Sequence, residues 1–600
     1  MSELVFVNAV YFNDDNNIHL GQFILRDILK KHYSIDCINF DLLNKNGAIK
    51  YKESFLENIK IMGEYILNLS PRVVGFYTIC NAFIPAVKIA EYIKEKNKEI
   101  KVFFGGPQAT VTSYECLEAF PFIDAICLGE SERTIEQFVD TLWNQKSFAA
   151  VPGVAYRSEK KIRSNPCAEL IGEEQLEKYT VFDYTPFNIN KEARHRIEGG
   201  RGCPFGCTFC TTSTFWGRHY RVKPVDVILN EMVKCNEIYG VKHFGIEHDM
   251  FTVNRQYILH FCKNFRKRGL PFDWTCSSRV DVLDEELIDC MTGANCVGIY
   301  LGIETGSARI QKIINKNLNL KNAVETIRYI CSKRQCAITA SFIFCYPDET
   351  IEDFKETIKL MEELLLLSNR ITVQLHRFIP LPSTEETEKI KDRIYFDETT
   401  LEATQDNISL EEVKDLVLEY PNMFSQYYTF DSPVKEYYKR FDSFILLIDT
   451  VKEFYSNCFL YLIKKYGLET LFFRIEEYIE NVYLLLNRIM EVTQNTINTP
   501  ERRFLEINMA IEPFWKREVE LDQTVYFEEL YEYERYKSIF YLEQRKDTVV
   551  KCFKINIKEA LENQVMLEEE SFVKYYRRGE KIYTSYLVKK KKDDKERNVR

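Results

Sequence analysis

The stretch that decides the fold class places three cysteines on one glycine-rich loop. It reads Gly199-Gly200-Arg201-Gly202-Cys203-Pro204-Phe205-Gly206-Cys207-Thr208-Phe209-Cys210. A predicted strand over 196–199 comes before the cysteines and helical spacing follows them, so we expect them on a loop at the end of that strand. Three thiolates at C-x3-C-x2-C spacing can hold one face of a [4Fe–4S] cluster. Because no fourth cysteine is close in sequence, one iron would stay open to an external ligand.

A zinc site is the alternative interpretation of the same cysteines. Zinc sites commonly use paired C-x2-C or Cys/His sets with four protein ligands, and His219 could be the fourth ligand here. Most other cysteines stand singly among apolar residues, as Cys127 and Cys262 do. Such positions predict small buried side chains, not ligands.

Length and composition predict a multidomain globular protein. The chain has 600 residues, of which 45% are hydrophobic and 28% are charged, so it is too long for one core and too apolar for disorder. Its formal net charge of −10 argues against a general nucleic-acid binder. No apolar run is long enough to span a membrane. Eighteen cysteines in a chain without a signal-peptide pattern suggest reduced thiols and a cytoplasmic location.

Strand–helix alternation occurs twice along the chain. Residues 1–150 alternate short apolar strands with helical stretches, which predicts a Rossmann-like, doubly wound α/β domain. Residues 151–192 resemble a linker. Residues 193–400 contain six further strand–helix units and predict a partial (β/α)6 barrel, whose chemistry would lie at the carboxyl ends of its strands. Residues 401–600 predict a mainly α-helical domain for substrate enclosure or partner contact. Its helical periodicity covers 409–420, 434–466, 468–495 and 500–518.

The cysteine loop resembles the C-x3-C-x-Φ-C motif of the radical S-adenosylmethionine (SAM) enzymes, in which Φ is aromatic. Cys203, Cys207, Phe209 and Cys210 match it. The resemblance implies that the three cysteines hold a [4Fe–4S] cluster. It further implies that the open iron binds the amino and carboxylate groups of SAM, and that Phe209 packs near the adenine.

Later strand ends of the predicted barrel resemble other elements of the same family. The resemblance implies that Ser278 or Arg279 contacts the methionyl carboxylate and that Glu304 binds the ribose hydroxyls of SAM. An acidic pair that relatives carry at the second strand end is also matched. The residues at that end are the candidate acid/base groups for the substrate step, and they are Glu247, His248 and Asp249.

The first domain resembles the cobalamin-binding branch of this superfamily, so the resemblance covers about residues 1–400. The segments 105–109 and 129–132 match its Gly-Gly-x-x-Ala/Pro turn and its Gly-Glu-x-Glu element. The Asp-x-His-x-x-Gly motif that supplies a histidine to cobalt is not matched, so we expect cobalamin without a histidine ligand from that motif. The implied cobalamin contacts are Thr78, Asn81, Gly105, Gly106, Gln108, Gly129 and Glu130.

The resemblance implies a class B radical SAM methyltransferase that uses two molecules of SAM. Methylcobalamin would donate the methyl group and a 5′-deoxyadenosyl radical would abstract hydrogen from an unactivated carbon. The substrate would be a natural product, peptide or metabolite, and flavodoxin or ferredoxin the reductant. The same cofactors also support cyclisation, ring contraction or carbon–carbon coupling without methyl transfer. A cobalamin-binding sensor with a vestigial barrel is the non-enzymatic alternative, which the intact cysteines and Glu304 oppose.

Overall fold

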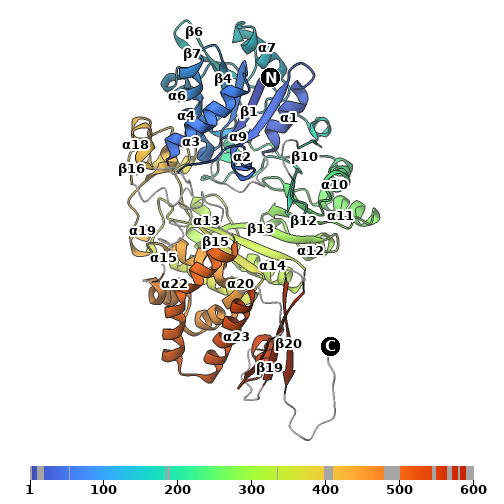
Figure 1. Ribbon diagram of the computed structural model, residues 1–600, viewed down its shortest axis with the longest axis vertical. Coiled ribbons are helices and arrows are strands. Elements are labelled where there is room, and N and C mark those ends of the chain that lie inside the picture. The colour runs from blue at the N-terminus through green and yellow to red at the C-terminus, as the bar shows by residue number, and fades with distance from the viewer. Residues whose placement is uncertain are drawn as a thin grey trace. The chain divides into compact units, whose positions relative to one another are not determined.

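A computed structural model describes most of the chain, and the chain divides into two compact units (Figure 1). One unit contains residues 1–354 and 376–437, and the other contains 355–375 and 438–600. The described residues are 3–9, 19–52, 54–181, 183–184, 189–333, 335–397, 410–476, 478, 500–542, 549–563, 571–578 and 581–588.

The first sheet has seven strands in the order β2-β1-β3-β4-β5-β6-β7. The strands are β1 (Leu4–Asn8), β2 (Ile35–Asn39), β3 (Val73–Tyr77), β4 (Lys101–Gly105), β5 (Ala125–Cys127), β6 (Val154–Ser158) and β7 (Lys161–Ser164). The first five pair in parallel and the last two are antiparallel. Every residue of β1 is buried, as expected for a parallel strand covered on both faces.

Helices cover both faces of this sheet. They are α1 (Leu20–Leu29), α2 (Phe40–Lys45), α3 (Phe55–Asn68), α4 (Cys80–Lys96), α5 (Pro107–Val111), α6 (Ser113–Ala119) and α7 (Ile135–Trp143). Helix α3 packs beside α4 on one face, and α1 packs beside α7 on the other (Figure 1). This arrangement is the predicted doubly wound one, and it places the ends of β3 and β4 at one edge, where ligands bind in such sheets.

The second sheet has six strands in the order β15-β14-β13-β12-β11-β8. They are β8 (His195–Glu198), β11 (His243–Glu247), β12 (Asp273–Ser278), β13 (Cys296–Glu304), β14 (Ala337–Phe344) and β15 (Ile371–Arg377). The intervening helices are α9 (Thr211–Trp216), α10 (Val225–Tyr239), α11 (Arg255–Lys267), α12 (Glu285–Thr292), α13 (Ala308–Ile313), α14 (Leu320–Ser332) and α15 (Ile351–Leu367). The pairs from β8 through β14 are parallel, so their carboxyl ends meet at one edge.

The structure differs from the expected domain boundaries at two places. Strands β6 and β7 extend the first sheet to Ser164, inside the stretch that resembles a linker, and α8 (Glu173–Leu176) follows. Residues beyond 400 also fold with the first unit. The core of the first domain includes Met423 and Phe424, which come after α18 (Leu410–Glu419). The segment between the barrel and the last 160 residues therefore belongs to the first domain's packing.

The second unit is mainly helical, as predicted, but it also contains a small sheet. Its helices include α20 (Phe441–Tyr466), α22 (Pro500–Asp522), α23 (Val525–Leu542) and α24 (Ile557–Asn563). An antiparallel sheet in the order β18-β19-β20 follows, made of β18 (Val549–Phe553), β19 (Ser571–Arg578) and β20 (Lys581–Val588). Within the helix predicted over 468–495, residues 477 and 479–495 lie outside the described residues.

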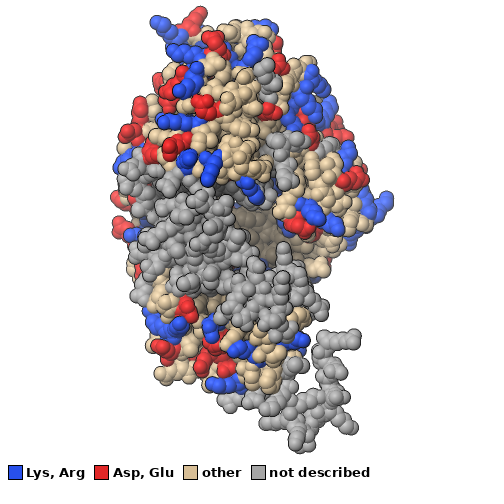
Figure 2. Space-filling model, in the orientation of Figure 1, with Lys and Arg blue, Asp and Glu red and all other residues tan. Residues whose placement is uncertain are grey.

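None of the described helices is both long enough and apolar enough to cross a bilayer. On the face drawn in Figure 2, Lys and Arg side chains are interspersed with Asp and Glu.

Candidate active site

The three cysteines lie between β9 (Gly200–Arg201) and α9, and each is half-buried with a free thiol. Burial raises the pKa of Cys203 to about 11, and the neighbouring Cys210 and Cys207 contribute to the same shift, so the three thiols lie near one another. Burial also raises the pKa of Cys207, whereas the cations of Lys316 and Arg279 lower it. Nearby cations stabilise a thiolate, which is the form that binds iron.

Asp249 fixes the start of the cysteine loop. Its Oδ2 accepts a hydrogen bond from the backbone N–H of Gly202 at 2.9 Å, and its Oδ1 accepts one from Thr212 Oγ1 at 3.2 Å. Gly202 has a φ of +81°, and a Cβ there would lie 1.9 Å from the carbonyl oxygen of His219. Only glycine fits this turn, and Asp249 positions the loop through these two hydrogen bonds.

The donor set of this loop fits a [4Fe–4S] cluster. In the described part of the chain, no three His, Cys, Asp or Glu side chains converge on a site for a single ion. A [4Fe–4S] cluster does not need three side chains to converge on one metal ion, because each cysteine binds a different iron of the cluster. The guanidinium of Arg279 lies 4.0 Å from the ring centre of Phe205, between the first two cysteines, which brings a cation to the loop.

Arg279 is the residue after β12, and it keeps one free donor. Its Nε and Nη2 bind the carboxylate of Asp281 at 2.9 and 2.8 Å, and Nη2 also donates to the carbonyl oxygen of Lys316. Its Nη1 is buried without a hydrogen-bond partner. Because an unpaired buried guanidinium nitrogen is costly, this atom is suited to a carboxylate ligand.

The hydroxyl of Ser278, in contrast, is already hydrogen-bonded. It donates to the carbonyl oxygen of Arg279 at 2.9 Å and lies 2.5 Å from Thr252 Oγ1. The expectation that Ser278 or Arg279 binds a carboxylate therefore narrows to Arg279, since the serine hydroxyl is already used inside the fold.

Glu304 ends β13 in a left-handed conformation, with a φ of +70°. Its Oε1 accepts a hydrogen bond from Lys316 Nζ at 2.9 Å, and both side chains are buried. Lys316 lies twelve residues after Glu304, and no local motif in the sequence indicates it. The pair holds the Glu304 carboxylate at the carboxyl end of β13, beside the strand that Arg279 follows.

The aromatic ring of Phe209 packs into an apolar cluster beside the cysteine loop. Its centroid lies 5.8 Å from that of Tyr346, which in turn lies 5.7 Å from Phe378 after β15. The hydroxyl of Tyr346 is buried without a partner. The rings of Phe209, Tyr346 and Phe378 thus form an apolar surface beside the cysteine loop, which disfavours water there.

The three acid/base candidates after β11 do not act as a set. His248 is buried, its Nδ1 accepts from the N–H of Met250 at 2.9 Å, and its Nε2 lies 3.0 Å from the carbonyl oxygen of Arg221. Burial lowers the pKa of His248 to about 4, so this is a neutral structural histidine. Glu247 and Asp249 are both exposed, but both oxygens of Asp249 accept hydrogen bonds, whereas Glu247 lies 3.7 Å from Arg196 Nε. The two carboxylates therefore differ in how far the fold already uses them.

In the first domain, Thr78 and Gly106 build the turn at the ends of β3 and β4. Thr78 donates through N and Oγ1 to the carbonyl oxygen of Gly105 at 2.8 and 2.9 Å. Gly106 has a φ of +98°, and a Cβ there would lie 2.6 Å from the carbonyl oxygen of Thr78. These residues shape the edge through their backbone, which lets a ligand approach closely.

The polar groups at this edge differ in whether they already have a hydrogen-bond partner. Gln108 is buried and donates through Nε2 to the carbonyl oxygen of Met423 at 2.9 Å. Asn81 keeps a buried Oδ1 without a partner. Gly129 has a φ of +62°, and its N–H donates to Thr110 Oγ1. Among the predicted cobalamin contacts, Asn81 thus keeps a side-chain oxygen without a hydrogen-bond partner.

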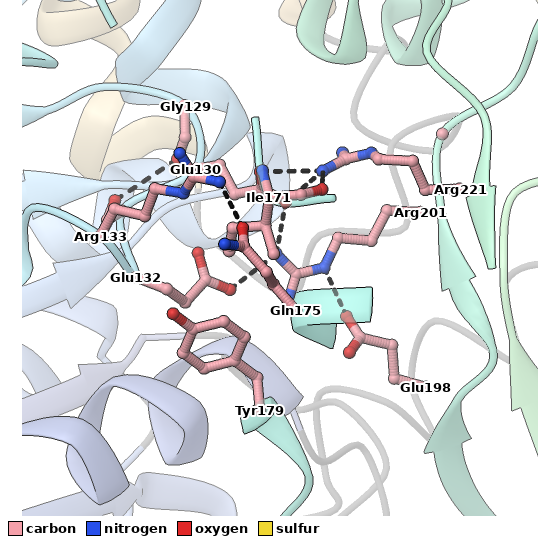
Figure 3. A network of polar contacts seen from close by, with 12 residues as sticks. Gly129, Glu130, Glu132, Arg133, Ile171, Gln175, Tyr179, Glu198, Arg201 and Arg221 are labelled. Atoms are coloured by element: carbon pink, nitrogen blue, oxygen red, sulfur yellow. Dashed lines mark hydrogen bonds and ion pairs between the residues drawn. The ribbon is translucent and has the colours of Figure 1, made fainter. Parts of the chain in front are cut away.

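Glu130 does not face the sheet edge but joins the first domain to the cysteine loop (Figure 3). Its Oε1 lies 2.5 Å from Arg201 Nη1, and both its oxygens lie 2.9 Å from Arg221 Nη1. Its Oε2 also accepts from the N–H of Ile171 at 2.8 Å. Glu130 thus forms ion pairs with two arginines of the barrel, and its predicted contact with cobalamin stays a prediction.

Arg201 is the centre of this network (Figure 3). Besides Glu130, it contacts Glu132 at 2.6 Å and Glu198 at 2.7 Å, and its side chain is 7% exposed. Burial alone would lower the pKa of Arg201, but the surrounding carboxylates of Glu198, Glu132 and Glu130 raise it well above its ordinary value. A permanently charged arginine two residues before Cys203 therefore ties the cysteine loop to the first domain.

Comparison with known proteins agrees with this geometry. Residues 197–361 match the family model of the radical SAM superfamily, which spans β8 to α15 and contains all three cysteines. The part of the chain that carries the cysteine loop is therefore similar to radical SAM enzymes.

Relatives of known name include both methyltransferases and cyclases. An uncharacterized methyltransferase of Pyrococcus horikoshii is 29% identical over 54% of this chain and 71% of its own length. An anaerobic magnesium-protoporphyrin IX monomethyl ester cyclase of Rubrivivax gelatinosus is 30% identical over 50% of this chain and 56% of its own length. A cytidylyl-2-hydroxyethylphosphonate methyltransferase of Streptomyces wedmorensis is 27% identical over 47% and 58%, respectively. The chain thus spans little more than half the length of two of these relatives.

Solved structures show the fold class. The cobalamin-dependent SAM radical enzyme OxsB, with aqua-cobalamin bound, aligns with a TM-score of 0.58 at 16% identity, covering 86% of this chain and 80% of that one. The radical SAM methyltransferase TsrM of Kitasatospora setae, with cobalamin and a [4Fe–4S] cluster bound, aligns at 0.54 and 16%, covering 65% and 75%. The predicted multidomain α/β fold class is confirmed, and the match of residues 197–361 agrees with the predicted superfamily.

Proposed function

We propose that this chain is a cobalamin-dependent radical SAM enzyme that methylates an unactivated carbon and uses two molecules of SAM per turnover. The observation that supports it best is the Glu130–Arg201 link. It joins the cysteine loop of the barrel to the strand-end turns of a doubly wound domain within one compact unit. Two of the three relatives above are methyltransferases by name, which favours methyl transfer over other radical chemistry.

When bound, the cluster, SAM and cobalamin supply the electron, the radical chemistry and the methyl group. The chain binds and orients them. The free Nη1 of Arg279 is suited to the carboxylate of SAM, and Lys316 holds Glu304 at the neighbouring strand end. Cys203, Cys207 and Cys210 would hold the cluster, and Asp249 fixes their loop.

The remaining residues of the mouth shape the surroundings of the reaction. The rings of Phe209, Tyr346 and Phe378 exclude water, which protects reactive species from side reactions. Glu247 is the proposed proton acceptor for the substrate step, because its carboxylate stays half-exposed.

We propose a small-molecule or peptide substrate, a flavodoxin or ferredoxin as reductant, and a cytoplasmic location. Many of the 18 cysteines are single, buried residues, such as Cys116 and Cys235, which fits a reducing compartment. The net charge of −10 does not favour nucleic acid as a partner.

A cyclase without methyl transfer is the second candidate. It is favoured by the cyclase of Rubrivivax gelatinosus, which at 30% has the higher identity to this chain, although over fewer residues than the methyltransferase of Pyrococcus horikoshii. Both candidates need the same cysteine loop and the same Arg279 donor, so the products of SAM must distinguish them.

The proposed function predicts two products from SAM. Protein reconstituted anaerobically with iron, sulfide and cobalamin is incubated with SAM and a strong reductant, and mass spectrometry counts 5′-deoxyadenosine and S-adenosylhomocysteine. We expect both. 5′-Deoxyadenosine alone would favour the cyclase, and neither product from protein that retains its cluster and cobalamin would contradict an enzyme of this kind.

A further inference from the structure

Residues 420–430 form a strap that links the edges of the two sheets within the first unit. At one end, Gln108, which follows β4, donates through Nε2 to the carbonyl oxygen of Met423 at 2.9 Å. At the other, Ser425 Oγ donates to the carbonyl oxygen of Pro380, which follows β15, at 2.6 Å. The strap therefore runs from the predicted cobalamin turn to the mouth of the barrel.

Apolar contacts hold the strap on both sides. The ring of Phe424 lies 5.5 Å from that of Phe83 on α4, inside the core of the first domain. The ring of Phe430 lies 6.0 Å from that of Phe378, in the same apolar cluster as Tyr346. Because both flanks are anchored, the residues between them have a defined position.

Gln426 lies between these anchors, in the short 3-10 turn η5 (Ser425–Tyr427). Its residue is 1% exposed, yet neither Oε1 nor Nε2 has a hydrogen-bond partner. Buried polar side chains are nearly always paired, and an amide that leaves both of its polar atoms unpaired loses free energy on folding. A bound group that offers both a donor and an acceptor would remove that cost.

We propose that Gln426 binds a peripheral carboxamide of cobalamin, an inference that rests on the proposed function. A primary carboxamide pairs with another one reciprocally, N–H to oxygen in both directions, and cobalamin carries several around its ring. Gln108, one of the expected cobalamin contacts, donates through Nε2 to the carbonyl oxygen of Met423, three residues before Gln426. The strap therefore carries a second amide three residues after the group that Gln108 binds.

The test measures cobalamin affinity in the full-length protein. Hydroxocobalamin is titrated into apoprotein and followed by absorbance, for the wild type, Gln426→Leu, Gln426→Glu and the control Gln137→Leu, whose side chain on α7 is exposed. We expect Gln426→Leu to weaken binding about tenfold, corresponding to the loss of about one charge-free hydrogen-bonded pair. The ionised side chain of Gln426→Glu accepts but cannot donate hydrogen bonds, so the affinity of this variant should lie between those of the wild type and Gln426→Leu. Gln137→Leu should bind as the wild type does.

Two further probes identify the group that is bound. Cobinamide retains the ring carboxamides, so Gln426→Leu should weaken its binding equally. The heptamethyl ester of cobyrinic acid lacks carboxamide donors, so the wild type should lose its advantage over Gln426→Leu with this ligand. Variants are compared only at unchanged melting temperature, and Gln426→Glu serves if the leucine variant misfolds.

Each outcome has a distinct meaning. Equal hydroxocobalamin affinity for the wild type and a folded Gln426→Leu would overturn the inference, because a substrate amide or an ordered water would then be the partner. A wild type that binds no cobalamin at all would instead contradict the proposed function.

Discussion

Replacement of Cys207 by alanine is expected to abolish the iron–sulfur cluster and, with it, all formation of 5′-deoxyadenosine. The three cysteines of the loop are the donor set for the cluster, and a loop left with two thiolates cannot hold it. Anaerobic reconstitution followed by iron and sulfide analysis should fall from about four irons per wild-type chain to near zero.

Cys290→Ala is the matched control for this variant. Cys290 is also half-buried and free, but it lies on α12 away from the motif. We expect it to retain both cluster and product. A Cys207→Ala protein with wild-type iron content would contradict the assigned donor set.

Replacement of Glu130 by alanine is expected to destabilise the first unit by about 3–5 kcal/mol, the usual effect of removing one partner from a buried ion pair. Glu130 is 4% exposed at its side chain and neutralises two buried arginines, Arg201 and Arg221. The variant would leave both of them short of a counter-charge. Denaturant unfolding followed by a probe in the first unit measures the effect.

The same variant should loosen the cysteine loop. Because Arg201 stands two residues before Cys203, we expect the Glu130→Ala protein to lose its cluster to a chelator several times faster than the wild type. Glu136→Ala on α7 is the control, since Glu136 is 55% exposed and only approaches His32 at 3.6 Å. Exposed ion pairs contribute about 0–1 kcal/mol to the free energy of unfolding, so this control should be nearly as stable as the wild type. If the two variants unfold at the same denaturant concentration, the Glu130 network does not stabilise the fold.

Most parallel strands of both sheets could be predicted from the sequence because they are short, mainly apolar runs, as β1 and β14 are. Strand β7 could not, since three of its four residues are exposed and it carries no apolar pattern. For that reason the sequence predicts a linker over 151–192. Strands β18 to β20 begin at Val549, beyond the last stretch of helical periodicity at 500–518, in a part of the chain predicted only as the remainder of a helical domain.

The candidate site could be predicted wherever its residues lie close together in the sequence. The cysteine motif occupies eight residues, so spacing alone indicated its chemistry. Glu130 and Arg201 are 71 residues apart, and their burial depends on finding each other, which no local pattern reports. The two backbone partners of His248, Met250 and Arg221, are likewise visible only in the folded chain.

The most direct measurement of the central claim follows the methyl group of SAM. Protein loaded with cluster and cobalamin is reduced and given SAM that carries a trideuteromethyl group, and the cobalamin is then extracted for mass spectrometry. We predict that the deuterated methyl group appears on the extracted cobalamin, matched by an equal amount of S-adenosylhomocysteine. Unlabelled cobalamin and no S-adenosylhomocysteine, from protein whose cluster still cleaves SAM to 5′-deoxyadenosine, would contradict methyl transfer.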